Sequence, residues 1–150
     1  MKIKVAWIGK TKEPAIQTLT DEYLKRISHY AEIAGVALKD EDAILSLASL
    51  EGRQKQNKER YKLIVLDSRG KQVSSEELAA FLEREQVNAM PLLFAIGGSD
   101  GFSEQTRRRA ALTLSFGKMT LPHELARVVL LEQLYRAFTI LKNHPYHLGH

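Results

Sequence analysis

The sequence predicts an α/β fold, with a mostly parallel sheet and helices on both of its faces. Two runs are apolar without alternation, KLIVL at 62–66 and PLLFAI at 91–96, as is typical of strands buried on both faces of a parallel sheet. Segments with helical spacing separate the strand candidates, which is the pattern of an α/β protein. At 150 residues, we expect one domain that spans 1–150.

The first part of the chain is expected to contain two strands and two helices. The opening MKIKVAWIGK alternates like a strand, which we place at 3–9. Apolar side chains recur at helical spacing over 13–31 and predict an amphipathic helix. A second strand over 33–38 precedes a charged helical stretch over 41–60, whose second half is strongly polar.

Two further strands and a helix are expected in the middle of the chain. The strand at 62–66 ends at a turn sequence, Asp67–Gly70. The next helix opens with a serine cap and early acids and runs over 74–86. It leads to the strand at 91–96, which a double glycine closes.

The last third is expected to hold a helix from Ser103, a strand at 112–115 and a final helix over 123–141. The final helix contains the run Val128–Leu131 and has no polar side in its middle, which indicates burial on several sides. Either it is a central core helix or it packs against a second subunit. We favour the second interpretation, because a last helix usually lies at the periphery.

The composition excludes several kinds of site. The chain has no cysteine, which rules out disulfides, thiolate metal ligands and thiol nucleophiles and suits a reducing cytoplasm. No apolar run approaches the roughly 18 residues of a membrane span, so we expect a cytoplasmic protein. Lys and Arg number 22 against 18 Asp and Glu, a net charge of +4. This mild excess is compatible with RNA as a partner without establishing it.

The candidate ligand site lies where the strands end. In open α/β sheets, ligands bind outside the carboxyl ends of strands, here at 66–67, 96–98 and 115–121. The P-loop motif and a GxGxxG after the first strand are absent, so neither a P-loop ATPase nor a standard dinucleotide fold is expected. The cluster Gly97–Gly101 is either a tight turn or a close approach of backbone to a flat ligand. The loop 116–121 suits the same pocket, because backbone groups bind an adenine edge while apolar side chains cover its faces.

The tail KNHPYHLGH holds His144, His147 and His150. Pro145 interrupts helical geometry and no carboxylate lies in the tail, so we expect no metal site. The tail is interpreted as a segment that presents side chains to a substrate or docks on a partner subunit. A frayed chain end is the alternative.

Three segments carry a family resemblance: LLFAIGGSDGFS, LSFGKMTLPHELARVVLLEQLYRAF and NHPYH. Together they resemble the bacterial ribosomal RNA large-subunit pseudouridine N3-methyltransferases, which belong to the SPOUT class of S-adenosylmethionine-dependent enzymes. The resemblance covers essentially the whole chain. It implies a C-terminal trefoil knot, a rare exception to unknotted folds, and a homodimer packed through the C-terminal helix. The implied substrate is a pseudouridine in a stem-loop of 23S ribosomal RNA, recognised in the assembled ribosome.

The resemblance also implies a methyl-donor pocket. Its residues would be Leu66, Gly97, Phe116, Gly117, Lys118, Met119, Thr120 and Leu121. Because N3 of a pseudouridine carries a proton that must leave, a histidine is a natural general base. The candidates are His123, His144 and His147, and the choice among them stays open.

Several other side chains are expected to orient the RNA rather than take part in the chemistry. These RNA-contact candidates are Arg107, Arg127, Arg136, Lys142 and Tyr146. The triplet Arg107–Arg109 has a plainer interpretation as a solvated helix face. We also expect Glu132 and Arg136 to pair, since they lie four residues apart on one helix face.

Two places depart from the family pattern. Leu148 stands where an arginine commonly follows HPYH, so His147 or His150 would have to replace an arginine contact to phosphate, or RNA would bind more weakly. The pair Ser99-Asp100 replaces the usual Pro-Glu, which is a mild change within a turn.

Two rival functions stay open from the sequence. One is a catalytically silent dimer of the same fold that binds RNA or the ribosome. The other is a flavodoxin-like domain for a small ligand. Binding of S-adenosylmethionine would reject the first in its simplest form, and a bound flavin would favour the second.

Overall fold

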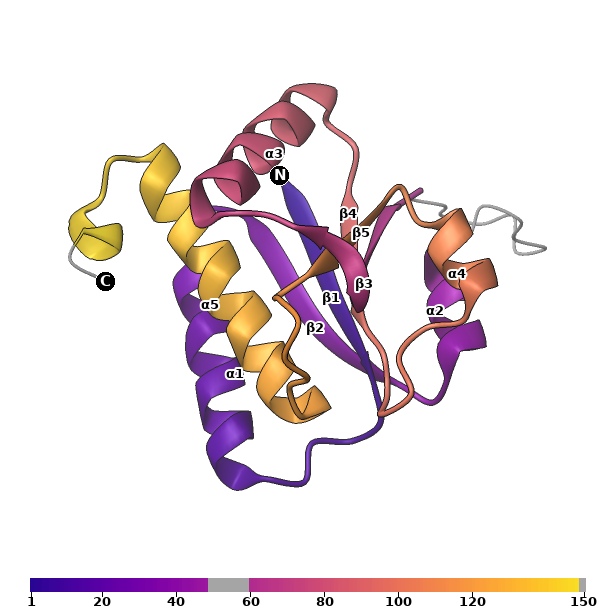
Figure 1. The fold of residues 1–150 in the computed structure, drawn as a ribbon. Helices are drawn as coiled ribbons and strands as arrows, with labels where there is room; N and C mark the ends of the chain where they lie inside the picture. The colour runs from indigo at the N-terminus through magenta and orange to yellow at the C-terminus, as the bar shows by residue number, and fades with distance from the viewer. Residues whose placement is uncertain (49–59, 149–150) are drawn as a thin grey trace.

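The computed structural model describes residues 1–48 and 60–148. At the centre of these residues lies a five-stranded sheet in the order β2-β1-β4-β3-β5, in which every pair is parallel (Figure 1). Its strands are β1 (Lys2–Ile8), β2 (Glu32–Leu38), β3 (Lys62–Gln72), β4 (Leu92–Ile96) and β5 (Leu112–Ser115). The predicted parallel α/β fold is confirmed.

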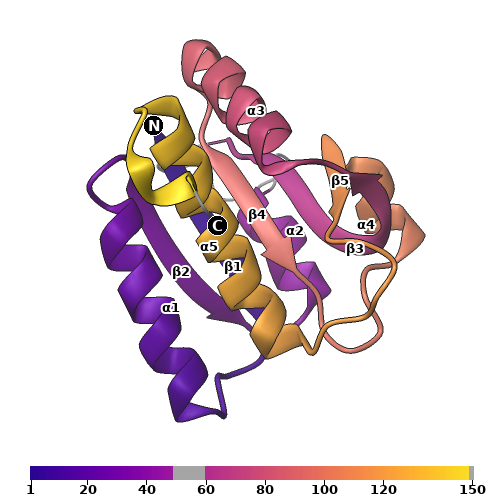
Figure 2. The ribbon, with the colours of Figure 1, turned by 60° about the vertical axis from the view of Figure 1, so that its left-hand side comes forward.

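Helices cover both faces of the sheet (Figures 1 and 2). On one face lie α1 (Pro14–Ile27), α3 (Ser75–Asn88) and α5 (His123–Leu141), and on the other lie α2 (Glu41–Ala48) and α4 (Glu104–Arg109). A short 3-10 helix, η1 (Pro145–His147), follows α5. The predicted helix over 41–60 is observed as α2, and its part over 49–59 lies outside the described residues.

Each face of the sheet has its own apolar core. Val5 and Phe94 belong to the core under α1, α3 and α5, whereas Ala6 and Leu93 belong to the core under α2. Because both faces are covered, every residue of β4 is buried. This explains why the central strands appear in the sequence as unbroken apolar runs.

The predicted turn at Asp67–Gly70 is wrong. β3 continues through these residues to Gln72 and curls around the end of β5 (Figure 2). Leu114 of β5 pairs with Leu66 and, after a shift in register, also with Lys71. The β3 backbone on both sides of this shift thus lies against β5, which leads on to α5.

At this register shift Gly70 lies directly against β5, so Gly70→Ala is expected to destabilise the fold. A Cβ here would lie 2.6 Å from the carbonyl oxygen of Thr113 and 2.7 Å from the carbonyl carbon of Leu114. Overpacking of this kind costs about 1–3 kcal/mol, and the β5 backbone has little room to move because it pairs with β3 before and after the register shift. We expect the free energy of unfolding, measured in urea, to fall by about 2 kcal/mol or more.

Gly98→Ala is the matched control for this prediction, because a Cβ at Gly98 meets no atom within 4 Å. Equal stability of the two alanine variants would contradict the close approach of Gly70 to β5.

The final helix α5 has the bounds that the sequence predicts. It lies between α1 and α3 on the sheet, so its own chain buries much of its surface. Its buried residues are Ala126, Arg127, Val128, Leu130, Leu131, Leu134, Ala137, Phe138 and Thr139. The core-helix interpretation therefore accounts for most of its apolar character. The side chains of α5 that stay at the surface, among them Leu125, are available for a subunit interface.

Candidate active site

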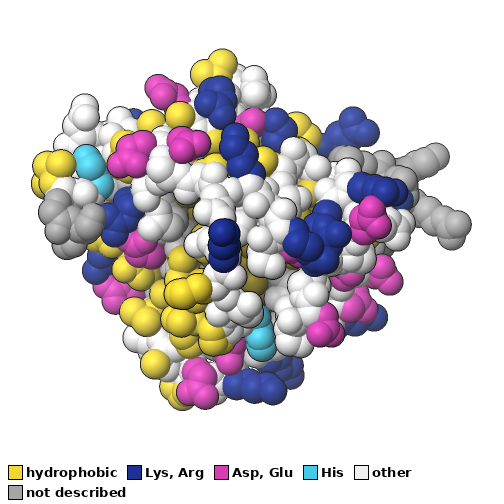
Figure 3. Space-filling model, viewed as in Figure 1, with side chains coloured by type: hydrophobic (Ala, Val, Ile, Leu, Met, Phe, Trp, Pro, Cys, Tyr) yellow, Lys and Arg dark blue, Asp and Glu magenta, His cyan; other side chains and the backbone are white. Residues whose placement is uncertain are grey.

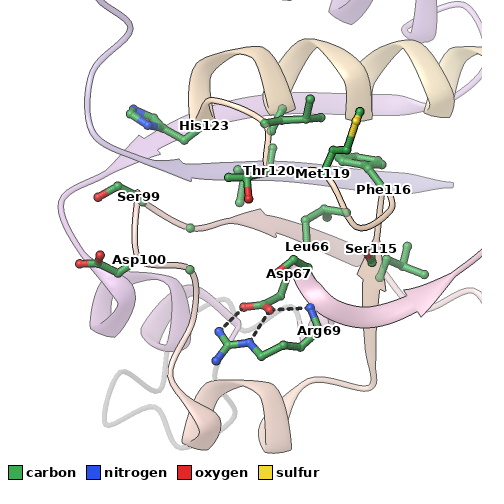
Figure 4. A pocket seen from close by; sticks show the side chains of 18 of the residues that line it. Leu66, Asp67, Arg69, Ser99, Asp100, Ser115, Phe116, Met119, Thr120 and His123 are labelled. Atoms are coloured by element: carbon green, nitrogen blue, oxygen red, sulfur yellow. Dashed lines mark hydrogen bonds and ion pairs between the residues drawn. The ribbon is translucent and has the colours of Figure 1, made fainter.

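A pocket opens at the carboxyl ends of β3, β4 and β5, beside the first turn of α5 (Figure 4). Residues 66–69 of β3 and the connections that follow β4 and β5 form its walls. Among its lining residues are seven of the eight predicted cofactor residues, Leu66, Gly97, Phe116, Gly117, Met119, Thr120 and Leu121. Lys118 is exposed and does not line the pocket. The sheet thus brings together residues as far apart in the sequence as Leu66 and Ala126, as the strand-end rule predicts.

Residues of three neighbouring strands give the pocket an apolar base. Leu66, Ile96 and Leu114 are each buried and line it. Leu121 and Ala126 extend this apolar surface from the loop before α5 and from α5 itself. Such a surface suits the flat face of an aromatic ring.

The loop after β5 presents backbone groups to the pocket. Its start is fixed by Ser115, whose Oγ donates to the carbonyl oxygen of Gly117 (2.9 Å) and accepts from the Gly117 N–H (3.0 Å). Gly117 has a φ of 126°, which strongly favours glycine. Within the described residues, the backbone N–H and C=O groups of 118–121 make no backbone hydrogen bond. They are free to bind a ligand edge.

Asp67 holds the opposite wall of the pocket in place. Its carboxylate accepts from Nε and Nη2 of Arg69, both at 2.8 Å, from the Arg69 N–H (3.0 Å) and from the Phe102 N–H (3.1 Å). Figure 4 shows the two side chains paired beneath Leu66. The hydrogen bonds from the Arg69 side chain hold the pKa of Asp67 well below its usual range, against the effect of its burial. The end of β3 is thereby tied to the loop after β4.

We expect Asp67→Asn to lower the free energy of unfolding by about 2–3 kcal/mol at pH 7, because hydrogen bonds to a charged group contribute about 1.5–3 kcal/mol. The pKa of Asp67 is lower in the folded chain. Its stabilisation is therefore fully present above the unfolded pKa of about 4 and is lost as the pH falls below it. The measurement is urea denaturation of both proteins between pH 7 and pH 3. A stability difference that stays constant over this range would mean that the ionised carboxylate does not hold the loop.

The glycines of the loop after β4 allow the tight backbone conformation of that loop. Gly101 has a φ of 72°, and a Cβ there would lie 3.0 Å from Oδ2 of Asp67. A Cβ at Gly97 would lie 3.2 Å from the carbonyl carbon of Gly101. The predicted tight turn is therefore observed, and the close approach to a ligand stays a prediction. Gly97 lines the pocket, but a side chain there would press on the loop itself.

The three histidine candidates for the general base do not converge within one chain. His123 lies at the rim of the pocket, with its ring directed away from Asp67, on the side of Ser99 and Asp100 (Figure 4). His144 and His147 lie beyond the other end of α5, whose 19 residues span roughly 27 Å. There, Nδ1 of His144 accepts a hydrogen bond from the Tyr146 N–H at 3.1 Å. His144 thereby caps the start of η1. His150 lies outside the described residues.

The described part of the tail, residues 142–148, is docked against the C-terminal half of α5 rather than frayed. The ring of Tyr146 packs edge-on against Tyr135 at 4.6 Å, and its hydroxyl donates to Glu132 (3.2 Å). Arg136 forms the predicted pair with Glu132 and lies over the Tyr146 ring. Burial raises the pKa of Tyr146. Tyr146 and Arg136 thus anchor the tail.

One predicted RNA contact is wrong. Arg127 has no exposed surface, and its guanidinium donates to Thr11 and to the carbonyl oxygen of Ile8 inside the protein. Of the other candidates, Arg107 is half-buried and donates to the carbonyl oxygen of Phe102 (2.7 Å), whereas Lys142 is exposed. The arginines after Arg107 lie exposed on α4, as a solvated helix face would.

The family follows from comparison with known proteins. Residues 1–147 match the family model described as "Predicted SPOUT methyltransferase". The chain belongs to this SPOUT methyltransferase family. Two similar relatives are both named "Ribosomal RNA large subunit methyltransferase H". The relative from Koribacter versatilis is 57% identical over 100% of both chains, and the relative from Geobacter sulfurreducens is 42% identical over 98% of this chain and 99% of its own.

Solved structures agree with the fold of this SPOUT methyltransferase. A probable methylase family protein from Haemophilus influenzae matches with a TM-score of 0.55 at 13% identity, over 96% of this chain and 69% of its own. The SpoU methyltransferase AviRb from Streptomyces viridochromogenes, in complex with AdoMet, matches with a TM-score of 0.52 at 14% identity, over 90% of this chain and 57% of its own. In the described part of the SPOUT methyltransferase, no helix is long and apolar enough to cross a membrane.

Proposed function

We propose that this SPOUT methyltransferase transfers a methyl group from S-adenosylmethionine to N3 of a pseudouridine in a stem-loop of 23S ribosomal RNA, in the assembled ribosome. One observation carries the proposal. The apolar base of the pocket faces a loop whose backbone groups over 118–121 make no backbone hydrogen bond in the described residues. The names of the full-length relatives support ribosomal RNA as the substrate.

The residues present fit S-adenosylmethionine. Leu66, Ile96 and Leu121 offer apolar contact to the faces of an adenine, and the free backbone groups of the loop suit its polar edge. The Asp67 carboxylate is already saturated by Arg69 and Phe102, so it shapes the wall rather than binding the ligand. When bound, S-adenosylmethionine supplies an activated methyl group on a sulfonium.

The protein itself holds the acceptor nucleotide in position and supplies a side chain that accepts its proton. Methyl transfer is an in-line displacement, so holding the acceptor nitrogen against the pocket is the main task of the protein. His123 is the candidate base from the same subunit, because it lines the rim of the pocket. His144 and His147 are candidates only from a second subunit, since they lie beyond the far end of α5.

A homodimer packed through α5 completes the proposed site. Several apolar side chains stay exposed on and near this helix: Leu19 (40%), Phe116 (40%), Met119 (79%) and Leu125 (41%). Figure 3 shows hydrophobic side chains gathered over the N-terminal half of α5 and the neighbouring helix. A second copy that covers this surface would bury it. In such a dimer, the tail of one subunit is proposed to reach the pocket of the other.

Two measurements on the purified protein test the proposal. We expect calorimetry to detect binding of S-adenosylmethionine, and we expect methyl label from it to enter 23S ribosomal RNA of ribosomes that lack the modification. Failure to bind S-adenosylmethionine would favour the silent dimer, and a copurified flavin would favour the small-ligand domain. Label that enters purified 23S RNA but not ribosomes would contradict the assembled ribosome as the substrate.

A further inference from the structure

The connection between β1 and α1, residues 9–13, lies beside the pocket but is not part of it. Trp7 of β1 pairs with Ile96 of β4, so the end of β1 lies next to the glycine loop that lines the pocket. None of the residues 9–13 is among those that line the pocket. This β1–α1 loop therefore lies on the outer rim, where a macromolecular substrate would extend beyond the reacting nucleotide.

The first turns of α5 clamp the β1–α1 loop. Arg127 donates through Nη1 to Oγ1 of Thr11 (2.9 Å) and through Nη2 to the carbonyl oxygen of Ile8 (3.2 Å). Its guanidinium also lies 5.1 Å from the centroid of the Trp7 ring. Burying a whole arginine to hold an exposed loop has a desolvation cost. The two hydrogen bonds and the ring contact offset this cost and hold the loop in place against α5.

Glu124 adds a second clamp from the same turn. Its Oε1 accepts from the Lys12 N–H (2.7 Å) and more weakly from the Glu13 N–H (3.4 Å). α1 has no side-chain cap of its own at Glu13, and Glu124 instead binds the backbone N–H groups that directly precede the helix. The β1–α1 loop and the start of α1 are thus fixed to the helix that carries His123.

The clamped loop presents two free cations. Lys10 and Lys12 are exposed, and within the described residues neither ammonium group has a salt-bridge partner. Figure 3 shows Lys and Arg side chains gathered at the lower edge of the molecule, over the connection that leads into α1 in Figure 1. Of the acids near them, Glu124 is already bound to backbone N–H groups, and Glu13 at the end of the loop is exposed.

We propose that the β1–α1 loop binds phosphate groups of the RNA strand that flanks the target nucleotide, with Lys10 and Lys12 as the contacts. Glu124 and Arg127 act as positioning residues that fix the loop relative to the pocket. Lysine contacts to phosphate fix the register of a nucleic acid without reading its sequence. The inference rests on the proposed function, because the loop has this role only if RNA is the substrate.

The test compares two double variants that lose the same charge. Lys10→Ala with Lys12→Ala removes the proposed contacts. Arg60→Ala with Arg84→Ala removes two exposed cations, one just before β3 and one near the C-terminal end of α3, at the other end of the sheet. Ribosome binding is measured over a series of salt concentrations, and S-adenosylmethionine binding is measured by calorimetry.

We expect the Lys10/Lys12 variant to bind ribosomes about tenfold more weakly. The slope of log K against log salt should fall by roughly 1.4–1.8, for two phosphate contacts at about 0.7–0.9 each. Binding of S-adenosylmethionine should not change in either variant. If wild type binds and methylates ribosomes and both double variants behave alike, this inference fails while the proposed function stands. If wild type neither binds nor methylates ribosomes, both fail.

A second comparison tests the clamp without removing the buried arginine. Glu124→Ala loses the acceptor for the Lys12 N–H, whereas Glu124→Gln keeps an oxygen that accepts the same hydrogen bond. We expect Glu124→Ala to weaken ribosome binding and Glu124→Gln to restore most of it, with S-adenosylmethionine binding unchanged in both. Equal ribosome affinities of the two variants would overturn the positioning role.

Discussion

Truncation before His144 is expected to abolish methylation of ribosomes while leaving S-adenosylmethionine binding unchanged. The pocket is built from the ends of β3, β4 and β5, whereas the tail docks beyond the opposite end of α5, through Tyr146. Removing it takes no lining residue from the pocket of its own chain. It does remove the segment that we propose to complete the site of a second subunit. The measurements are calorimetry with S-adenosylmethionine and transfer of methyl label to ribosomes.

Subunit complementation separates a role in the partner's site from a role in the same chain. A truncated subunit keeps an intact pocket, and a subunit with a disrupted pocket keeps an intact tail. Mixed dimers of the two should recover methylation that neither variant shows alone. Loss of S-adenosylmethionine binding on truncation, or no recovery in mixed dimers, would contradict the proposed division between pocket and tail.

Gly117→Val is expected to weaken S-adenosylmethionine binding by about tenfold or more. The φ of Gly117 is 126°, and a strained backbone conformation of this kind costs about 1–3 kcal/mol for other residues. A Cβ at this position meets no atom within 4 Å, so the effect acts through the backbone of the loop and not through a clash. The loop is expected to leave the conformation in which its 118–121 backbone groups face the ligand.

Lys118→Ala serves as the control for the pocket. Lys118 belongs to the same loop, but it is exposed and does not line the pocket. This variant should bind S-adenosylmethionine as wild type does. Wild-type affinity in the Gly117→Val protein would mean that the conformation of this loop does not form the binding site.

The place of the site could be predicted from the sequence because it follows from sheet topology. Unbroken apolar runs identify parallel strands, and parallel strands direct their ends to one edge. The positions of the strand ends alone therefore predict that Leu66, Gly97 and the 116–121 loop lie together. Only the exposed Lys118 does not line the pocket.

What the sequence did not predict depends on partners that lie far along the chain. Arg127 bonds to Thr11, 116 residues away, so an arginine that suits an RNA contact by its charge is in fact a buried clamp. Asp67 and Arg69 form a turn sequence when taken alone, but Phe102 holds them in an extended strand. The local sequence around these residues does not indicate such long-range pairings. The burial of α5 between α1 and α3 was likewise indistinguishable from a subunit interface by periodicity.

Nucleoside mass spectrometry of 23S ribosomal RNA tests the central claim most directly. RNA from cells that contain the protein is compared with RNA from cells that lack it and from cells in which it has been restored. We predict one pseudouridine that carries an extra methyl group at N3 when the protein is present, that loses it when the protein is absent, and that regains it on restoration. An identical set of methylated nucleosides in all three RNAs would contradict the account.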